Sequence, residues 1–479
     1  MYSVVVAFGI ASVMLCLGMI LRGKVKPLQN MLMPVSVIGG LLGFAFVNII
    51  MSNVDIGGAT VKDFSNIVDV FFCLSFISIG LTGEKKKKKA PPSPEGKKHS
   101  GTARGAMGMA LIWCILYALT PSAGVLIVSV IGKLFGMAPM YGILIPFAFC
   151  QGPGQASTYG RLFENVYGYE NAEMVALTYA ACGFVAAFGL GVPLAKYGLR
   201  KGLARNKEKI NQAVERGYLL PEEQREPIGK VTFHSANIDT LAAHFAVMGV
   251  AYLLALVLAK LVAFVPGIGE SFAAMLFMWG MFASYIVKAV MRKLKIDYLI
   301  NNSLQSRITG FLSDYLVVCS FMAIQVRVIG KWIIPIIVVS IVGALITFIV
   351  CLYFGARLGS DHDFERVLGV YGTCTGTTPS GVSLVRMVDP RLQTPVGVEL
   401  GVMNAAMILS TPTMIFITLV GLETISLPIC VGGMLLTVIL YLVLLKVFKV
   451  WRKPTFSIGF GKKKNSDVVV EDVEDVPFL

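Results

Sequence analysis

Two short stretches decide the fold: Cys150-Gln-Gly-Pro-Gly-Gln-Ala-Ser157 and Thr373-Cys-Thr-Gly-Thr-Thr-Pro-Ser-Gly381. Each one interrupts an apolar segment of membrane length with glycine, proline and small polar residues. Such residues break the backbone hydrogen-bond ladder of a helix, and each unpaired peptide group in hydrocarbon costs several kcal/mol. Both stretches are therefore expected to be buried in protein or to line a wet cavity.

The composition indicates a membrane protein with several spans. Of the 479 residues, 56% are hydrophobic and only 15% are charged, and the mean hydropathy is +0.74. Soluble globular proteins carry about 25% charged residues, so the helices of this chain are expected to face lipid. The net charge of +14 is spread over short basic runs between apolar segments, which argues against a nucleic-acid partner.

The sequence predicts no metal site and no cofactor. The nine cysteines lie in apolar segments without a CxxC pair, and the four histidines are scattered. Neither an HExxH motif nor a P-loop is present, so a zinc enzyme and an ATP-driven pump are both unsupported.

The apolar segments predict an all-α polytopic protein with eleven transmembrane helices, most of them long enough to cross about 30 Å of hydrocarbon. The segments 139–160 and 367–385 are predicted to be re-entrant, entering and leaving on one side. With the N-terminus outside and the C-terminus in the cytoplasm, all but six of the 42 lysines and arginines lie on the inner side. The predicted helices are 4–21, 31–50, 65–83, 106–135, 172–194, 238–264, 271–291, 309–327, 332–355, 396–420 and 424–447.

An internal repeat relates the two halves of the chain. Asp69-Val-Phe-Phe-Cys-Leu-Ser75-Phe-Ile-Ser-Ile79 and Asp314-Tyr-Leu-Val-Val-Cys-Ser320-Phe-Met-Ala-Ile324 share Asp, Ser, Phe and Ile at one spacing, although chance matching between apolar spans is the alternative. Each half has five spans, and an odd number inverts the second half, so the two re-entrant tips are expected to meet near the midplane. The predicted parts are the inverted repeats 1–194 and 238–420, a basic cytoplasmic linker 195–237, an extra helix 424–447 and a cytoplasmic tail 448–479.

The re-entrant segments are the predicted binding site for a small solute. Glycine lets the backbone approach a ligand, hydroxyl and amide side chains bind it, and the N-terminus of a broken helix favours an anion such as a carboxylate. The pattern is typical of a secondary transporter, and a glycine-rich packing seam between helices is the alternative. The predicted substrate-binding residues are Gln151, Gly152, Pro153, Gly154, Gln155, Ala156, Ser157, Thr375, Gly376, Thr377, Thr378, Pro379 and Ser380.

Polar residues within the spans are candidates for binding a cation. An aspartate in an apolar span costs about 3 kcal/mol, so Asp69 and Asp314 are expected to have a partner or a function, unless they are helix N-caps. Arg161 and Arg386 follow the two breaks and either attract an anion or anchor the segment ends. The predicted ion-binding residues are Asp69, Ser75, Asp314, Ser320, Thr373 and Asn404. Glu173 and Glu399 line the same cavity, or serve as caps or interface residues.

On these residues the chain resembles the bacterial sodium/glutamate symporters, in which two inverted five-span halves each carry a glycine-rich re-entrant loop. The first loop of that family reads Gly-His-Gly-Thr-Ala, and here it is Gly152-Pro-Gly-Gln-Ala156. The second reads Gly-Ala-Thr-Pro-Thr, and here it is Gly376-Thr-Thr-Pro-Ser380. The resemblance implies sodium-coupled import of glutamate or a related small carboxylate by alternating access. It also implies an elevator-like movement, a homodimer, and residence in the bacterial plasma membrane.

Three alternatives remain open from the sequence. The first is a transporter of another anion coupled to protons. The second is an intramembrane lipid-modifying enzyme that uses Asp361-His362-Asp363, which is otherwise a solvated loop. The third is a passive channel with the two re-entrant loops as its filter, although filters usually come from symmetric subunits around one axis.

Overall fold

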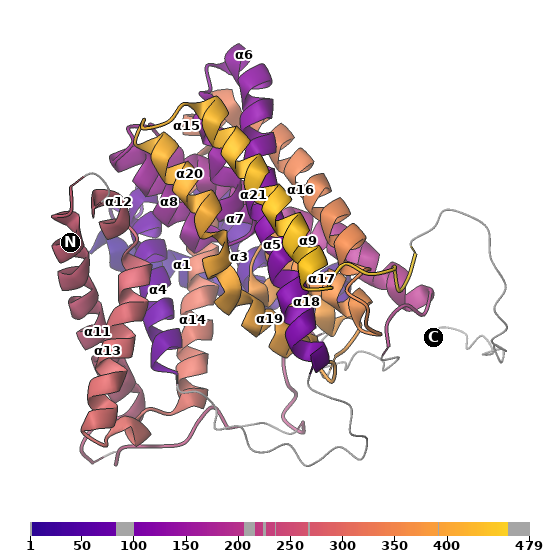
Figure 1. Cartoon of the computed structure of the whole chain (residues 1–479). Coiled ribbons are helices and arrows are strands. Elements are labelled where there is room, and N and C mark those ends of the chain that lie inside the picture. The colour runs from indigo at the N-terminus through magenta and orange to yellow at the C-terminus, as the bar shows by residue number, and fades with distance from the viewer. Residues whose placement is uncertain are drawn as a thin grey trace.

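The computed structural model describes residues 2–82, 100–205, 216–223, 227–234, 236–266, 269–390 and 392–457, and the described residues form helices without any strand. The lysine run 85–89 and the acidic cluster 471–475 lie outside this part of the chain. The helices form two bundles that lie side by side (Figure 1).

The first bundle contains the first three long helices of each half of the chain, and we call it the peripheral bundle. Helix α4 packs against α13 and α14, α1 packs against α3, and α11 packs against α13. Its members are α1 (Ser3–Lys24), α3 (Val35–Phe46), α4 (Val61–Leu81), α11 (Thr240–Ala263), α13 (Leu276–Lys293) and α14 (Asn302–Met322).

The second bundle contains the two broken segments, and we call it the hairpin bundle. Helix α5 is its centre and contacts α16, α19 and α21, while α9 packs against α8. Its members are α5 (Ser100–Ile127), α7 (Ile145–Phe149), α8 (Pro153–Asn165), α9 (Ala172–Arg200), α16 (Ile333–Gly355), α17 (Asp363–Cys374), α18 (Thr378–Arg386), α19 (Val396–Ala405), α20 (Thr411–Gly421) and α21 (Leu427–Val447).

Short helices connect or extend these elements. A π-helical turn extends α3 over Val47–Met51, and another extends α5 over Val128–Gly132. Helices α6, α12 and α15 lie toward the upper side in Figure 1, whereas the connection from α13 to α14 lies at the lower side. The remaining short elements are α2 (Lys26–Asn30), α6 (Lys133–Phe135), α12 (Gly269–Ala273), α15 (Val326–Ile329) and the 3₁₀ turns Pro139–Leu144, Asp297–Leu299, Gly330–Trp332 and Ala406–Ser410.

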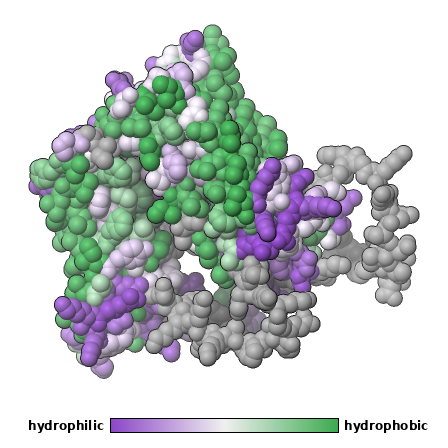
Figure 2. Space-filling view, in the orientation of Figure 1, coloured by the Kyte–Doolittle hydropathy of each residue, from purple (hydrophilic) through white to green (hydrophobic). Residues whose placement is uncertain are grey.

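The structure has helices in all eleven predicted ranges, but length and hydropathy identify fewer spans. Within the described residues, seven helices are long and apolar enough to cross a membrane, or eight if the bent pair α19 and α20 is one span. The ranges that fail the test are α3, which is short, and α13 and α14, which carry charged residues such as Lys288, Arg307 and Asp314. Figure 2 shows the broad apolar surface over the helices, with hydrophilic residues gathered at the lower ends of α11 and α13.

Local signals explain where α4 and α14 begin. Thr60 caps α4, and the Asp63 side chain accepts hydrogen bonds from the Thr60 amide and hydroxyl, each at 2.8 Å. Asn301 caps α14 by accepting a hydrogen bond from the Leu304 amide at 3.0 Å. The interpretation of Asp69 and Asp314 as N-caps is therefore wrong, because both lie well inside their helices.

Candidate functional site

The two broken segments form helical hairpins whose tips touch. Helix α7 ends at Phe149 and α8 begins at Pro153, and α17 ends at Cys374 and α18 begins at Thr378. A Cβ added to Gly152 would lie 2.6 Å from Cγ2 of Thr377 and 3.0 Å from the carbonyl oxygen of Gly376. Only glycine allows this approach, and the φ of +85° at Gly152 has the same requirement. The two breaks thus come together at one point, as the inverted repeat predicts.

Each break places the N-terminus of a half-helix at this point. Pro153 is the first residue of α8 and Pro379 is the second residue of α18, positions where the missing N–H of proline costs nothing. The first N–H groups of a helix have no intrahelical acceptor, and the helix dipole makes this end positive. Two such ends meet between the hairpins, an arrangement that favours a negatively charged group.

The rest of the bundle holds the carbonyl groups of the breaks in place. The Trp113 indole donates a hydrogen bond to the Cys150 carbonyl oxygen at 2.9 Å. The backbone of α9 approaches the second break so closely that a Cβ on Gly183 would lie 2.6 Å from the Thr375 carbonyl oxygen. The tips are therefore part of a packed interior and are not loose loops.

A cavity of about 250 Å³ lies beside the tips, between the two bundles. It is smaller than the ~300–1,000 Å³ typical of sites for drug-sized ligands, so it suits a small solute. The hairpins contribute Gln151, Pro153, Gly154, Thr377, Pro379, Ser380 and Ser383, and the peripheral bundle contributes Pro34, Ser36, Val37, Phe72, Ser75, Phe76, Ile79, Thr309, Ser313, Asp314, Leu316 and Val317, with Phe184 from α9.

Charge in this cavity comes from one side chain. Among the described lining residues Asp314 is the only ionisable group, and it faces the cavity from the middle of α14. Hydroxyl groups surround the same space, including those of Ser75 and Ser380. The buried amide oxygen of Gln151 has no hydrogen-bond partner in the described structure, as expected of a group that binds a ligand.

Some of the predicted substrate-binding residues line the cavity and the others do not. The lining residues among them are Gln151, Pro153, Gly154, Thr377, Pro379 and Ser380. Gly152 and Gly376 form the tip contact instead, and Gln155, Ala156, Ser157 and Thr375 are buried beside it. Thr375 donates to the Tyr371 carbonyl oxygen at 2.7 Å, and Thr378 is paired with Asn404 at 2.9 Å.

The predicted ion-binding residues lie in different places. Ser75 and Asp314 line the cavity, and the Ser75 hydroxyl donates to the Phe72 carbonyl oxygen at 2.8 Å, which leaves the lone pairs of its oxygen for a cation. The hydroxyl groups of Ser320 and Thr373 donate to carbonyl oxygens of their own helices, Val317 at 2.6 Å and Gly369 at 2.8 Å. Asp69 and Asn404 lie outside the cavity. No group of His, Cys, Asp and Glu in the described residues has the arrangement of a metal site.

Asp69 belongs to a cluster farther along α8, which we call the α8 cluster. Arg161 of α8 forms ion pairs with Asp69 of α4 at 2.6 Å and with Glu173 of α9 at 2.9 Å. The Ser157 hydroxyl lies 2.8 Å from Asp69 and 2.6 Å from Glu173, and Ser65 is bonded to both Glu173 and Arg161. Asp69 and Arg161 line a second cavity of about 210 Å³.

A second cluster, which we call the α17 cluster, holds the other hairpin. Arg366 of α17 contacts Asp363 at 3.0 Å and Glu399 of α19 at 2.7 and 2.8 Å. Glu399 was predicted from the sequence, but Arg366 was not, because Arg386 follows the second break as Arg161 follows the first. Arg386 is exposed at the end of α18.

Aromatic rings border both cavities. Phe72 of α4 lines both of them, and a Cβ on Gly154 would lie 2.0 Å from its ring. Phe72, Phe76 and Phe277 pack together with ring centroids 5.0–5.2 Å apart. These residues were not predicted from the sequence, because their role depends on the hairpin tip that they cover.

One known family matches most of the chain. The family model described as sodium/glutamate symporter matches residues 2–393, a region that contains both hairpins and both cavities. The match ends before α19. The search of curated proteins finds no match.

Proposed function

Since the chain belongs to the sodium/glutamate symporter family, a family of transporters and not of enzymes, we propose that it imports glutamate or a closely related carboxylate together with Na⁺. The family membership also removes the lipid-modifying enzyme from consideration. In agreement, Asp361 is exposed and paired with Arg205 at 3.0 Å, and Asp363 belongs to the α17 cluster.

The substrate site in this proposal is the cavity beside the hairpin tips. The carboxylates of glutamate lie at the N-termini of α8 and α18, where free N–H groups and the helix dipoles favour negative charge. The Gln151 amide and the Ser380 hydroxyl bind the polar groups of the substrate. This assignment uses the described lining residues and the unpartnered amide oxygen of Gln151.

Asp314 provides the reason for coupling, and it is the observation that carries the proposal. Two like charges ~5 Å apart repel by ~3 kcal/mol at an effective dielectric constant of ~20. An anionic substrate therefore enters the cavity unfavourably while Asp314 is an uncompensated carboxylate. A Na⁺ ion bound by Asp314 and Ser75 removes the repulsion, and coupling of this kind is typically worth ~1–3 kcal/mol, or ~5–150-fold in affinity.

The two cavities support a cycle of alternating access. Both border Phe72, and the hairpins belong to one bundle while α4 and α14 belong to the other. In the proposed cycle the hairpin bundle moves against the peripheral bundle, and the Phe72 contact with Gly154 breaks and re-forms. We further propose a homodimer in a bacterial plasma membrane, with the N-terminus outside.

The test is glutamate binding and uptake by the purified full chain in proteoliposomes at low and high Na⁺. We expect wild-type protein to bind glutamate at least ~5-fold more tightly at high Na⁺. Asp314→Asn is expected to bind glutamate with less than ~2-fold dependence on Na⁺ and to lose uptake against a gradient.

The matched control is Asp69→Asn, which changes an aspartate of the other half that lies outside the cavity. It is expected to keep the Na⁺ dependence. Loss of Na⁺ dependence in Asp69→Asn but not in Asp314→Asn would move the cation to the α8 cluster. Uptake driven by a proton gradient without Na⁺ would replace sodium by protons as the coupling ion.

A further inference from the structure

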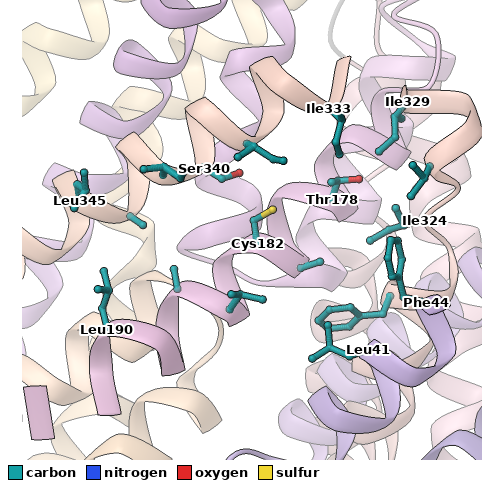
Figure 3. A pocket seen from close by; sticks show the side chains of 18 residues that line it. Leu41, Phe44, Thr178, Cys182, Leu190, Ile324, Ile329, Ile333, Ser340 and Leu345 are labelled. Atoms are coloured by element: carbon teal, nitrogen blue, oxygen red, sulfur yellow. The ribbon is translucent and has the colours of Figure 1, made fainter. Parts of the chain in front are cut away.

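A groove of about 530 Å³ runs between the two bundles, away from both polar cavities (Figure 3). Its floor comes from α3 and α14 on one side and from α9 and α16 on the other. Several of its side chains are exposed on the membrane-facing surface, including Val185 at 56% and Ile341 at 55%. The lining includes Leu190, Val326, Ile329, Ile333, Ile341 and Leu345.

The groove offers its occupant apolar contacts. The Ser340 hydroxyl donates to the Ile336 carbonyl oxygen at 2.8 Å, and the Thr178 hydroxyl donates to the Met174 carbonyl oxygen at 2.7 Å. Both hydroxyl groups are therefore satisfied within their own helices. Water gains little in such a space, whereas a hydrocarbon chain gains dispersion contacts and leaves no polar group unpaired.

The length of the groove matches the depth of one lipid leaflet. Figure 3 shows Ile329 and Ile333 near one end and Leu190 and Leu345 at the other. The twelve-residue step along α16 from Ile333 to Leu345 corresponds to ~18 Å at 1.5 Å per residue. Half of the ~30 Å hydrocarbon core is ~15 Å, so an acyl chain that enters at one end reaches the other.

Positive charge lies at the end of the groove formed by α15. Arg327 and Lys331 are exposed and lie in the same short segment as the lining residues Val326 and Ile329. The Lys331 ammonium lies 4.9 Å from the centre of the Trp332 ring. Trp332 itself is buried, whereas long basic side chains near the end of a membrane-spanning helix extend to the level of the lipid head groups.

From these observations we propose that the groove binds one anionic glycerophospholipid, with an acyl chain between the two bundles and the phosphate at Arg327 and Lys331. The site is distinct from the solute cavity, and its chemistry does not depend on what the protein transports. Because the acyl chain of the lipid contacts both bundles, the bound lipid stabilises the arrangement of the bundles seen here.

Native mass spectrometry of the full-length protein, after incubation with equal amounts of phosphatidylglycerol and phosphatidylcholine, tests the acyl-chain part. Ile341→Trp places a large ring in the groove, and Ile349→Trp places the same ring on the same helix outside it, at a position that is 61% exposed. We expect Ile341→Trp to retain one phospholipid fewer per chain than wild type, and Ile349→Trp to retain the same number.

The head-group part is tested with variants that do not alter the groove. Arg327→Gln combined with Lys331→Gln is expected to lose the preference for phosphatidylglycerol, while Lys133→Gln combined with Lys260→Gln keeps it. Equal lipid retention in Ile341→Trp and wild type would overturn the proposal. A change from dimer to monomer in Ile341→Trp would also overturn it, because the groove would then be an interface between two copies of the chain.

Discussion

The α8 cluster and the α17 cluster each hold a hairpin through one arginine and two carboxylates, but they differ in burial. In the α17 cluster the side chains of Arg366, Asp363 and Glu399 are 0–3% exposed. In the α8 cluster those of Arg161, Asp69 and Glu173 are 17–28% exposed and border a cavity. The first cluster is sealed in protein, whereas water reaches the second.

The clusters also differ in what they connect. Arg366 and Glu399 join α17 to α19, two helices of the hairpin bundle. Arg161 joins α8 of the hairpin bundle to Asp69 on α4 of the peripheral bundle. A movement of one bundle against the other leaves the α17 cluster intact but separates Arg161 from Asp69. We therefore expect the buried cluster to stabilise the fold and the accessible cluster to act as a latch in the proposed movement.

Removing a carboxylate from the α17 cluster is expected to have the largest effect. Glu399→Gln leaves Arg366 buried with one carboxylate fewer, and breaking a buried ion pair typically costs ~3–5 kcal/mol. We expect a clear loss of thermal stability and of folded protein after purification, measured by thermal unfolding in detergent.

The double variant Arg366→Met with Glu399→Leu serves as the control for this prediction. Apolar side chains of similar size remove the Arg366 charge together with the Glu399 charge, and the Asp363 carboxylate, which loses its pair with Arg366, keeps its hydrogen bonds from the Gly359 amide at 2.8 Å and the Thr455 hydroxyl at 3.0 Å. The double variant should be more stable than Glu399→Gln. Equal stability of the two variants would contradict a purely structural role for the cluster.

The latch is tested by Asp69→Asn, for which a smaller effect on stability is expected. Arg161 keeps its pair with Glu173 at 2.9 Å, and partly exposed ion pairs contribute ~1 kcal/mol or less. A bias of ~1 kcal/mol between two arrangements of the bundles nevertheless changes their populations about fivefold. We expect a change in uptake rate with little change in melting temperature. A stability loss as large as that of Glu399→Gln would contradict the assignment.

Much of the fold was predictable from local sequence, and the pairing within the clusters was not. Glycine and proline in an apolar segment act on the backbone directly, so the breaks near 150 and 375 and the helices around them follow from the residues themselves. Arg161 and Asp69 are 92 positions apart, and their contact depends on how α8 docks on α4. The repeat suggested Arg386 as the counterpart of Arg161 in the second half. In the structure it is Arg366 that is buried in an ion-pair cluster.

Asp314 illustrates the same limit within the site. The repeat gives Asp69 and Asp314 equal status, because both begin the same motif in the two halves. In the structure Asp69 forms an ion pair with Arg161, whereas Asp314 faces a cavity without a basic lining residue. Only the three-dimensional arrangement separates a structural aspartate from a candidate ion ligand.

The smallest expected effect concerns the surface end of the α17 cluster. His362 precedes Asp363 at the start of α17 and is half-buried, and burial together with the nearby Arg205 and Arg366 lowers its pKa below the ordinary 6.5. The unfolded chain then binds the proton more tightly than the folded protein. Stability that is present above pH 6.5 is therefore lost as the pH falls toward the folded pKa. His362→Gln should lose slightly less melting temperature than wild type between pH 7.5 and pH 5, whereas the exposed His234→Gln should follow wild type. If His362→Gln instead follows wild type, the acid sensitivity of this hairpin lies in the carboxylates of the cluster itself.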